Sequence, residues 1–228
     1  MATPRTALVI GASKNLGLGL AAELAGRGWD VIGTVRGAGK TGLHVLAESL
    51  AGGVRILEAD ITVVDDILNL REELGGAQLD LLFVNAGITD EDVPIGEVST
   101  EVFTRVMVTN ALSPLRVIET LGGLVTPGGT IAVMSSRQGS IGFNTRGGHE
   151  LYRASKSALN QLMRSYSARQ PERSLMLIHP GWVQTDLGGI GAPLTVDNSV
   201  SGIVDVLERH AGEPGLQFRD FQDEVVPW

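Results

Sequence analysis

The sequence of 228 residues contains no cysteine. This absence excludes disulfide bonds, thiolate metal sites and a cysteine nucleophile together. It is compatible with a reducing compartment, and we expect a cytoplasmic protein that holds no metal ion.

The chain also lacks an excess of positive charge. Lys and Arg number 18 against 26 Asp and Glu, so the formal net charge is −8. A nucleic-acid binder needs a basic stripe to meet phosphates, and the sequence has none. No apolar run reaches the roughly 18 residues that a membrane span needs, and the opening residues, MATPRTALVIGAS, show no charged and then apolar leader. We expect a soluble protein with neither a nucleic-acid nor a membrane partner.

Signs of a second domain are missing as well. The sequence shows no internal repeat, low-complexity tract or linker. With 43% hydrophobic residues, the chain can bury a substantial core. We expect residues 1–228 to form a single domain with a short C-terminal substrate region.

Short, almost continuously apolar runs alternate with longer amphipathic runs. The apolar runs predict buried strands at 6–11, 30–35, 54–59, 79–87, 129–136 and 174–181. The amphipathic runs predict helices at 16–27, 43–50, 63–74, 100–124, 151–169 and 198–210, the third of them capped by Thr62. This alternation predicts an α/β fold, a Rossmann-type doubly wound parallel sheet with helices on both faces.

Chemically distinctive residues follow the predicted strands. Ligands of such sheets bind beyond the carboxyl ends of the strands, near the point where the strand order reverses. The residues at these ends are Gly11, Arg36, Asp60, Asn85, Ser136 and Pro180. Their placement indicates a ligand site at this edge of the sheet.

The first predicted strand runs into a glycine-rich turn, ASKNLGLG, at 12–19. A phosphate at a helix N-terminus needs free backbone N–H groups and a backbone without a Cβ in the way. The turn matches G-x-x-x-G-x-G with Asn15 at the middle glycine, and Asn readily takes a positive φ. It therefore predicts a pyrophosphate cradle made by Gly11, Ser13, Lys14, Asn15, Leu16 and Gly17. The alternative is a glycine-rich packing turn.

The second predicted strand ends in GTVRG, at 33–37. An NAD site commonly places an acidic side chain here to bind the ribose hydroxyls. In this sequence Arg36 occupies the region, and Lys14 stands inside the glycine turn. Two cations without a carboxylate favour the 2′-phosphate of NADP(H) over NAD(H), and the alternative is a pair of solvated surface charges.

The stretch YRASK contains Tyr152 and Lys156, which are four residues apart and share one face of a helix. A free tyrosine has a pKa near 10, which is too high for easy proton exchange near neutrality. A lysine ammonium one turn away favours the phenolate and is expected to lower that pKa. Such a pair can exchange a proton with a substrate oxygen; the alternative is two residues of a surface helix.

Three other stretches favour the catalytic interpretation of Tyr152 and Lys156 over that of a surface helix. A predicted strand ends at Ser136, whose hydroxyl can hold a substrate carbonyl; Ser140 is a weaker candidate for this role. Asn110 lies inside a predicted helix, where a short amide is a poor helix former and calls for another explanation. The stretch FVNAG gives a small turn of close approach at Asn85, Ala86 and Gly87.

The chain resembles the short-chain dehydrogenase/reductase superfamily over essentially its whole length. The shared motifs are the glycine turn, N-A-G, the helical Asn, the Ser, Y-x-x-x-K and P-G-x-x-x-T, in that order. The spellings NLGLGL, TVR, YRASKSALN and VVPW most resemble the branch of C-factor and Sniffer-type carbonyl reductases. The resemblance implies a catalytic tetrad of Asn110, Ser136, Tyr152 and Lys156.

The resemblance also implies a role for each member of the tetrad. Tyr152 would be the general acid in reduction, and Ser136 would orient and polarise the carbonyl. Lys156 would lower the pKa of the tyrosine and bind the nicotinamide ribose. Asn110 would hold a water molecule in the proton relay.

Further cofactor contacts follow from the same resemblance. Asp60 and Ile61 would flank the adenine, although Asp60 could instead cap the next helix. The nicotinamide would be wrapped by Pro180, Gly181, Val183 and Thr185. The interval from Ser136 to Tyr152 is longer than the family's commonest spacing, which predicts a loop at the substrate mouth in which His149 is solvated.

The activity implied is an NADP(H)-dependent interconversion of a carbonyl compound, an aldehyde or a ketone, and an alcohol. The alternative is a non-catalytic dinucleotide-binding regulator or signalling protein on the same fold. The resemblance also implies a homodimer or homotetramer. Small residues on the helix at 151–169 would allow close contact between two subunits: Ala154, Ser155, Ser157, Ala158 and Ser165. The alternative is that these residues pack within one chain.

Overall fold

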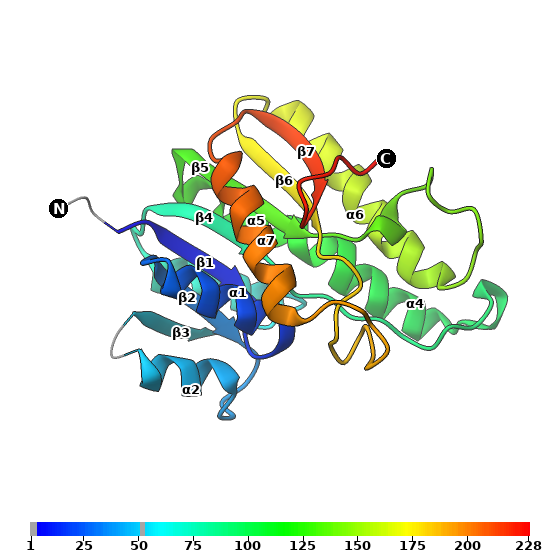
Figure 1. The fold of residues 1–228 in the computed structure, drawn as a ribbon, viewed down its shortest axis with the longest axis horizontal. Helices are drawn as coiled ribbons and strands as arrows, with labels where there is room; N and C mark the ends of the chain where they lie inside the picture. The colour runs from blue at the N-terminus through cyan, green and yellow to red at the C-terminus, as the bar shows by residue number, and fades with distance from the viewer. Residues whose placement is uncertain (1–3, 51–52) are drawn as a thin grey trace.

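Seven parallel strands form one sheet in the computed structural model, which describes residues 4–50 and 53–228 (Figure 1). The strands are β1 (Thr6–Ile10), β2 (Asp30–Val35), β3 (Val54–Glu58), β4 (Leu79–Val84), β5 (Val125–Met134), β6 (Ser174–His179) and β7 (Gly215–Asp220). Their order across the sheet is β3-β2-β1-β4-β5-β6-β7. Because the order reverses between β1 and β4, the protein is a doubly wound, Rossmann-type α/β domain, as predicted.

Helices cover both faces of the sheet (Figure 1). The helices α1 (Asn15–Gly26), α2 (Gly42–Ser49) and α7 (Val196–Arg209) bury their apolar sides in one core cluster. The helices α3 (Val64–Leu74), α5 (Ser113–Leu121) and α6 (Glu150–Arg169) bury theirs in a second cluster on the opposite face. A sheet covered on both faces needs strands that are apolar throughout, which explains the short apolar runs of the sequence.

The long helix predicted at 100–124 is interrupted in the structure. The helix α4 (Thr100–Met107) leads into a π-helical turn, η2 (Val108–Leu112), before α5 begins, and the 3₁₀ turn η3 (Gly122–Leu124) ends the segment. The Thr109 hydroxyl donates to the Arg105 carbonyl at 2.8 Å, a side-chain bond that competes with the regular helical pattern. π-Turns inside helices are frequent at functional sites, and this one contains Asn110.

Two expectations about the elements are wrong. The sequence reading missed β7, a strand whose residues are mostly half-buried and which therefore lacks the continuous apolar run of the others. Thr62 does not cap α3, because it donates instead through its N–H and hydroxyl to Asp60, at 2.8 and 2.7 Å. Asp60 thus organises the turn before α3 without capping the helix, whose N-cap residue is Val63, so the alternative of a helix cap is wrong for Asp60.

No helix among the described residues is both long and apolar enough to cross a membrane. The same part of the chain contains no group of three or more His, Cys, Asp or Glu residues arranged to hold a metal ion.

Candidate active site

A cleft of about 1,320 Å³ runs along the carboxyl ends of the strands. Most residues of the predicted site line it: Gly11, Ser13, Lys14, Asn15, Leu16, Arg36, Asp60, Ile61, Asn85, Ala86, Gly87, Ser136, Tyr152, Lys156, Pro180, Gly181, Val183 and Thr185. Gly17 and Asn110 are the predicted residues that do not. The lining also includes residues that were not predicted from the sequence, among them His179 and Asp220.

The turn between β1 and α1 is packed so closely that only glycine fits at its core. A Cβ on Gly17 would lie 2.1 Å from the Gly11 carbonyl oxygen and 2.6 Å from Nδ2 of Asn85. Asn85 holds the turn by donating from Nδ2 to that same carbonyl at 2.8 Å. Gly11 and Asn15 have φ values of +83° and +51°, so the predicted positive φ at Asn15 is confirmed.

The N-terminus of α1 opens into the cleft beside this turn. Its N-cap residue, Lys14, forms no side-chain capping bond. The first N–H groups of a helix have no partner within the helix, and they favour anions such as a pyrophosphate. The uncapped helix start and the close approach of the glycine turn therefore fit a dinucleotide cofactor.

The two cations of the predicted 2′-phosphate site both have carboxylate neighbours, contrary to the expectation. Lys14 Nζ donates to Asp186 at 2.6 Å, and Asn15 donates to the same carboxylate at 3.2 Å. Arg36 Nη1 lies 3.9 Å from Asp60 Oδ2, at the limit of an ion pair. Arg36 can therefore still bind a second anion, whereas a phosphate would compete with the Asp186 carboxylate for Lys14.

The carboxyl of Asp60 is ionised more easily than usual. Burial alone would raise its pKa, but the hydrogen bonds from the Thr62 hydroxyl and N–H, together with the Arg36 charge, hold the pKa below its ordinary value. At neutral pH the carboxylate is a hydrogen-bond acceptor, and its Oδ1 already accepts both hydrogen bonds from Thr62.

The predicted acid–base pair lies on α6, at the substrate end of the cleft. Burial raises the pKa of Tyr152 to about 12, although the neighbouring Ser136 hydroxyl lowers it. Burial also lowers the pKa of Lys156 to about 8. The predicted downward shift of the tyrosine pKa is therefore wrong for this structure, because the loss of water around the phenol outweighs the hydrogen bond with Ser136. The Lys156 Nζ lies 5.9 Å from the ring centroid.

Lys156 is fixed by the sheet as well as by its helix. The side chain is 3% exposed, and its Nζ donates to the Met134 carbonyl at 2.8 Å. Ser136, which follows β5, accepts from the Gln138 N–H at 3.1 Å and lines the cleft. Ser140, the weaker candidate, is fully buried, bonds the Trp228 carbonyl and is not part of the lining.

The sequence matches the family model described as short chain dehydrogenase over residues 5–190. The chain belongs to this family. A chain from Burkholderia multivorans, described as a short-chain dehydrogenase/reductase and solved with bound NADP, is 52% identical with a TM-score of 0.97, covering 99% of this chain and 100% of that one. The carbonyl reductase Sniffer of D. melanogaster is 30% identical with a TM-score of 0.86, covering 99% and 100%.

Among curated proteins, the C-signal of Myxococcus xanthus is 40% identical over 154 residues, which are 66% of this chain and 93% of that protein. These relatives confirm the predicted branch. As a short-chain dehydrogenase, the protein is an NAD(P)-dependent oxidoreductase that uses a dinucleotide cofactor and acts on small molecules.

Asn110 of this short-chain dehydrogenase lies beneath the cleft. Its Oδ1 accepts from the Ile88 N–H at 2.8 Å, and its Nδ2 donates to the Ile88 carbonyl at 2.8 Å and to Ser155 Oγ at 2.9 Å. The amide is therefore committed to the loop after β4 and to α6.

The substrate mouth is formed by the segments after β4, β5 and β6. Phe143, Trp182 and Leu187 line it with apolar surface, and Trp182 is 60% exposed. Exposed apolar side chains that gather at a cleft mark a binding surface. His149 also lines the cleft, yet its backbone N–H is bonded to Asp92 and its Nδ1 lies 3.6 Å from that carboxylate.

Several of the small residues on α6 have partners within the chain. Ser155 is buried against Asn110, and the Ser157 hydroxyl donates to the Gly139 carbonyl at 2.9 Å. Ala158 packs against the core cluster of that face. Ser155, Ser157 and Ala158 therefore pack within one chain, which was the alternative. They no longer support the expected dimer or tetramer.

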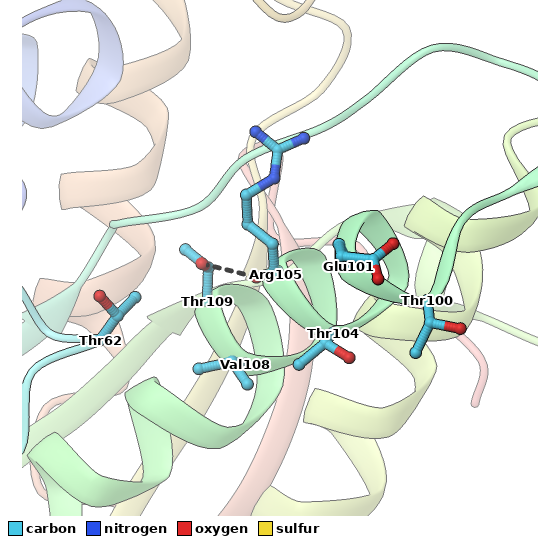
Figure 2. Close-up of a pocket in the computed structure, with 7 residues that line it drawn as sticks. All are labelled: Thr62, Thr100, Glu101, Thr104, Arg105, Val108 and Thr109. Carbon is cyan, nitrogen blue, oxygen red and sulfur yellow. Dashed lines mark hydrogen bonds between the residues drawn. The ribbon is translucent and has the colours of Figure 1, made fainter.

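A smaller pocket of about 550 Å³ opens beside α4 (Figure 2). It is lined by Thr62, Thr100, Glu101, Thr104, Arg105, Val108 and Thr109. Its titratable residues are Glu101 and Arg105, and Arg105 is paired with Asp90. This lining offers no acid–base pair suited to proton transfer near neutrality, whereas the larger cleft contains Tyr152 and Lys156.

Proposed function

We propose that the protein is an NADP(H)-dependent carbonyl reductase and alcohol dehydrogenase that uses Tyr152 as its general acid and base. The observation that carries the proposal is the convergence of a protonated phenol, a serine hydroxyl and a buried lysine in the cleft, next to the glycine cradle. A phenol whose pKa is about 12 is protonated at neutral pH, which is the form that donates a proton to a carbonyl oxygen.

The nicotinamide ring, when bound, supplies a hydride in reduction and accepts one in alcohol oxidation. In reduction the carbonyl carbon gains the hydride, while the carbonyl oxygen gains the proton of the Tyr152 hydroxyl and becomes an alcohol. Ser136 donates to the carbonyl oxygen and polarises it, and Lys156 presents its charge beside the tyrosine, where it stabilises the phenolate that the proton transfer leaves. Alcohol oxidation returns the proton to the phenolate.

The cofactor preference proposed is for NADP(H) over NAD(H). Its support is the position of Arg36 at the end of β2, since a guanidinium can form two hydrogen bonds with a phosphate. The Burkholderia relative with bound NADP gives independent support. The acidic residue that NAD sites place at this strand end is absent here, because Arg36 stands beyond Val35.

Loss of NADPH absorbance with a panel of aldehydes and ketones tests the proposal, with Tyr152→Phe as the matched control. We expect the parent to turn over at least one class of carbonyl and the Phe variant to lose about 10²–10⁴-fold of that activity, the scale of a missing general acid. NADPH affinity should change little, because the hydroxyl moves a proton and does not carry the cofactor. Tight NADPH binding without turnover of any carbonyl would favour the non-catalytic regulator instead.

A further inference from the structure

The turn that carries Ser136 is attached to α6 by side-chain hydrogen bonds. This turn, η4 (Arg137–Gly139), follows β5 and has Ser136 at its N-cap position. The Ser135 hydroxyl donates to Asn160 Oδ1 at 2.6 Å, and Asn160 Nδ2 donates to the Gly139 carbonyl at 3.2 Å. One amide therefore bonds both ends of the turn, and Ser136 lies between the two attachment points.

Asn160 occupies a favourable place on the helix for this task. Tyr152, Lys156 and Asn160 follow one another at intervals of four residues, so they lie along one face of α6. Asn160 is only 4% exposed and does not line the cleft. It therefore has no direct contact with a substrate and acts through its neighbours.

The turn packs closely against α6 at Gly139. A Cβ on Gly139 would lie 2.9 Å from Lys156 Cβ and 3.0 Å from Asn160 Nδ2. The Ser157 hydroxyl donates to the same Gly139 carbonyl at 2.9 Å, so the carbonyl has two donors from the helix. The turn touches the helix backbone directly, and the amide of Asn160 fixes its register.

We propose that Asn160 is a positioning residue for catalysis, which holds the Ser136 hydroxyl in register with Tyr152 and Lys156. The role rests on the proposed function, because Ser136 needs positioning only if it polarises a substrate carbonyl. Removal of the Asn160 amide leaves the buried Ser135 hydroxyl without its acceptor, and it leaves the Gly139 carbonyl with the Ser157 hydroxyl as its side-chain donor. The Ser136 turn then moves relative to the acid on α6.

The electrostatics of the site link this movement to the protonation of Tyr152. The Ser136 hydroxyl lowers the pKa of Tyr152 against the upward effect of burial. A displaced Ser136 therefore leaves the pKa of the tyrosine higher still. Alcohol oxidation needs the phenolate, so its rise with pH should move to higher pH.

The test compares Asn160→Ala with Leu159→Ala, a control that truncates a fully buried neighbour on the same helix and removes no hydrogen bond to the Ser136 turn. We expect Asn160→Ala to lose about 10- to 100-fold in kcat for carbonyl reduction, since a displacement of about 1 Å has that cost. Its dissociation constant for NADPH should stay within about threefold of the parent, because the cradle is elsewhere. Its pH profile for alcohol oxidation should shift upward, whereas the profile of Leu159→Ala should not.

Ser135→Ala provides a second route, because it removes one of the two bonds without altering α6. It should lose less kcat than Asn160→Ala, and the double variant should lose little more than Asn160→Ala alone, because the two residues act through one contact. Equal kcat values and unshifted pH profiles for Asn160→Ala and Leu159→Ala, compared at the same folded fraction, would overturn the role of Asn160. A parent enzyme that reduces no carbonyl would instead overturn the proposed function, and the role of Asn160 with it.

Discussion

Replacement of Arg36 should change the cofactor preference far more than replacement of Lys14. Both side chains are about 70% exposed, at 71% for Arg36 and 70% for Lys14. They differ in their partners, since Lys14 bonds Asp186 at 2.6 Å while Arg36 is 3.9 Å from Asp60. A phosphate can therefore bind the nearly free guanidinium of Arg36, whereas it must compete with the Asp186 carboxylate for Lys14.

The magnitude follows from the number of bonds. A hydrogen bond to a charged group contributes about 1.5–3 kcal/mol, and solvent exposure places this site at the lower end of that range. One such bond from Arg36 corresponds to about a tenfold preference for NADPH, and a two-bond contact raises it to about a hundredfold. Arg36→Ala should therefore lower kcat/KM with NADPH by about 10- to 100-fold and leave the value with NADH nearly unchanged. Lys14→Ala should change either value by less than about threefold.

A reversal of preference is best attempted at Arg36 itself. The neighbouring Val35 is 2% exposed and belongs to the apolar core cluster of α1, α2 and α7, so a carboxylate there would be buried without a partner. Arg36→Asp instead places the carboxylate at the exposed end of β2, where it repels the 2′-phosphate and can accept from the ribose hydroxyls.

The assay is the ratio of kcat/KM for NADPH and NADH in the parent, Arg36→Ala, Arg36→Asp and Lys14→Ala. The reasoning fails if the parent already prefers NADH. It also fails if Lys14→Ala reduces the ratio as much as Arg36→Ala, because the competition from Asp186 would then be irrelevant.

Two further properties can be measured without a known substrate. Burial lowers the pKa of Lys156 from its ordinary 10.5 to about 8, so between these pH values the unfolded chain binds more protons than the folded one. The free energy of unfolding should therefore rise with pH, by up to about 1.4 kcal/mol per pH unit from this group. Urea unfolding of the parent and of Lys156→Met at several pH values checks this, and an equal change of unfolding free energy with pH in both proteins would contradict it. A dimer or tetramer is still the expected assembly, and light scattering at micromolar concentration would refute it by giving only the 24.0 kDa mass of one chain.

The parts of the fold that could be predicted are those with a local cause. Six strands are short apolar runs because helices cover both sides of the sheet, and this pattern is visible in the sequence. The positive φ of Asn15 follows from the spacing of the glycines around it. β7 has only two fully buried residues, Phe218 and Asp220, so its pattern could not be distinguished from a loop.

The parts that could not be predicted depend on residues far apart in the chain. Lys14 and Asp186 are separated by 172 residues, and nothing near either of them announces the ion pair. The spacing of Tyr152 and Lys156 was correct, but the direction of the tyrosine's pKa depends on burial by other segments. The same limit applies to Asn110, whose amide partners, Ile88 and Ser155, are fixed only by the fold.

The two halves of the cleft are built by different physical means, and they should tolerate substitution differently. The cofactor half relies on empty space, since a Cβ on Gly17 would lie 2.1 Å from a carbonyl oxygen. The half with the proposed acid–base pair relies on buried side chains that donate to backbone carbonyls at the end of β5 and in the turn after it, as Lys156 does to Met134 and Asn160 does to Gly139. Added volume is therefore the damaging change at the cradle, whereas at α6 it is the loss of a polar atom, even when the volume is kept.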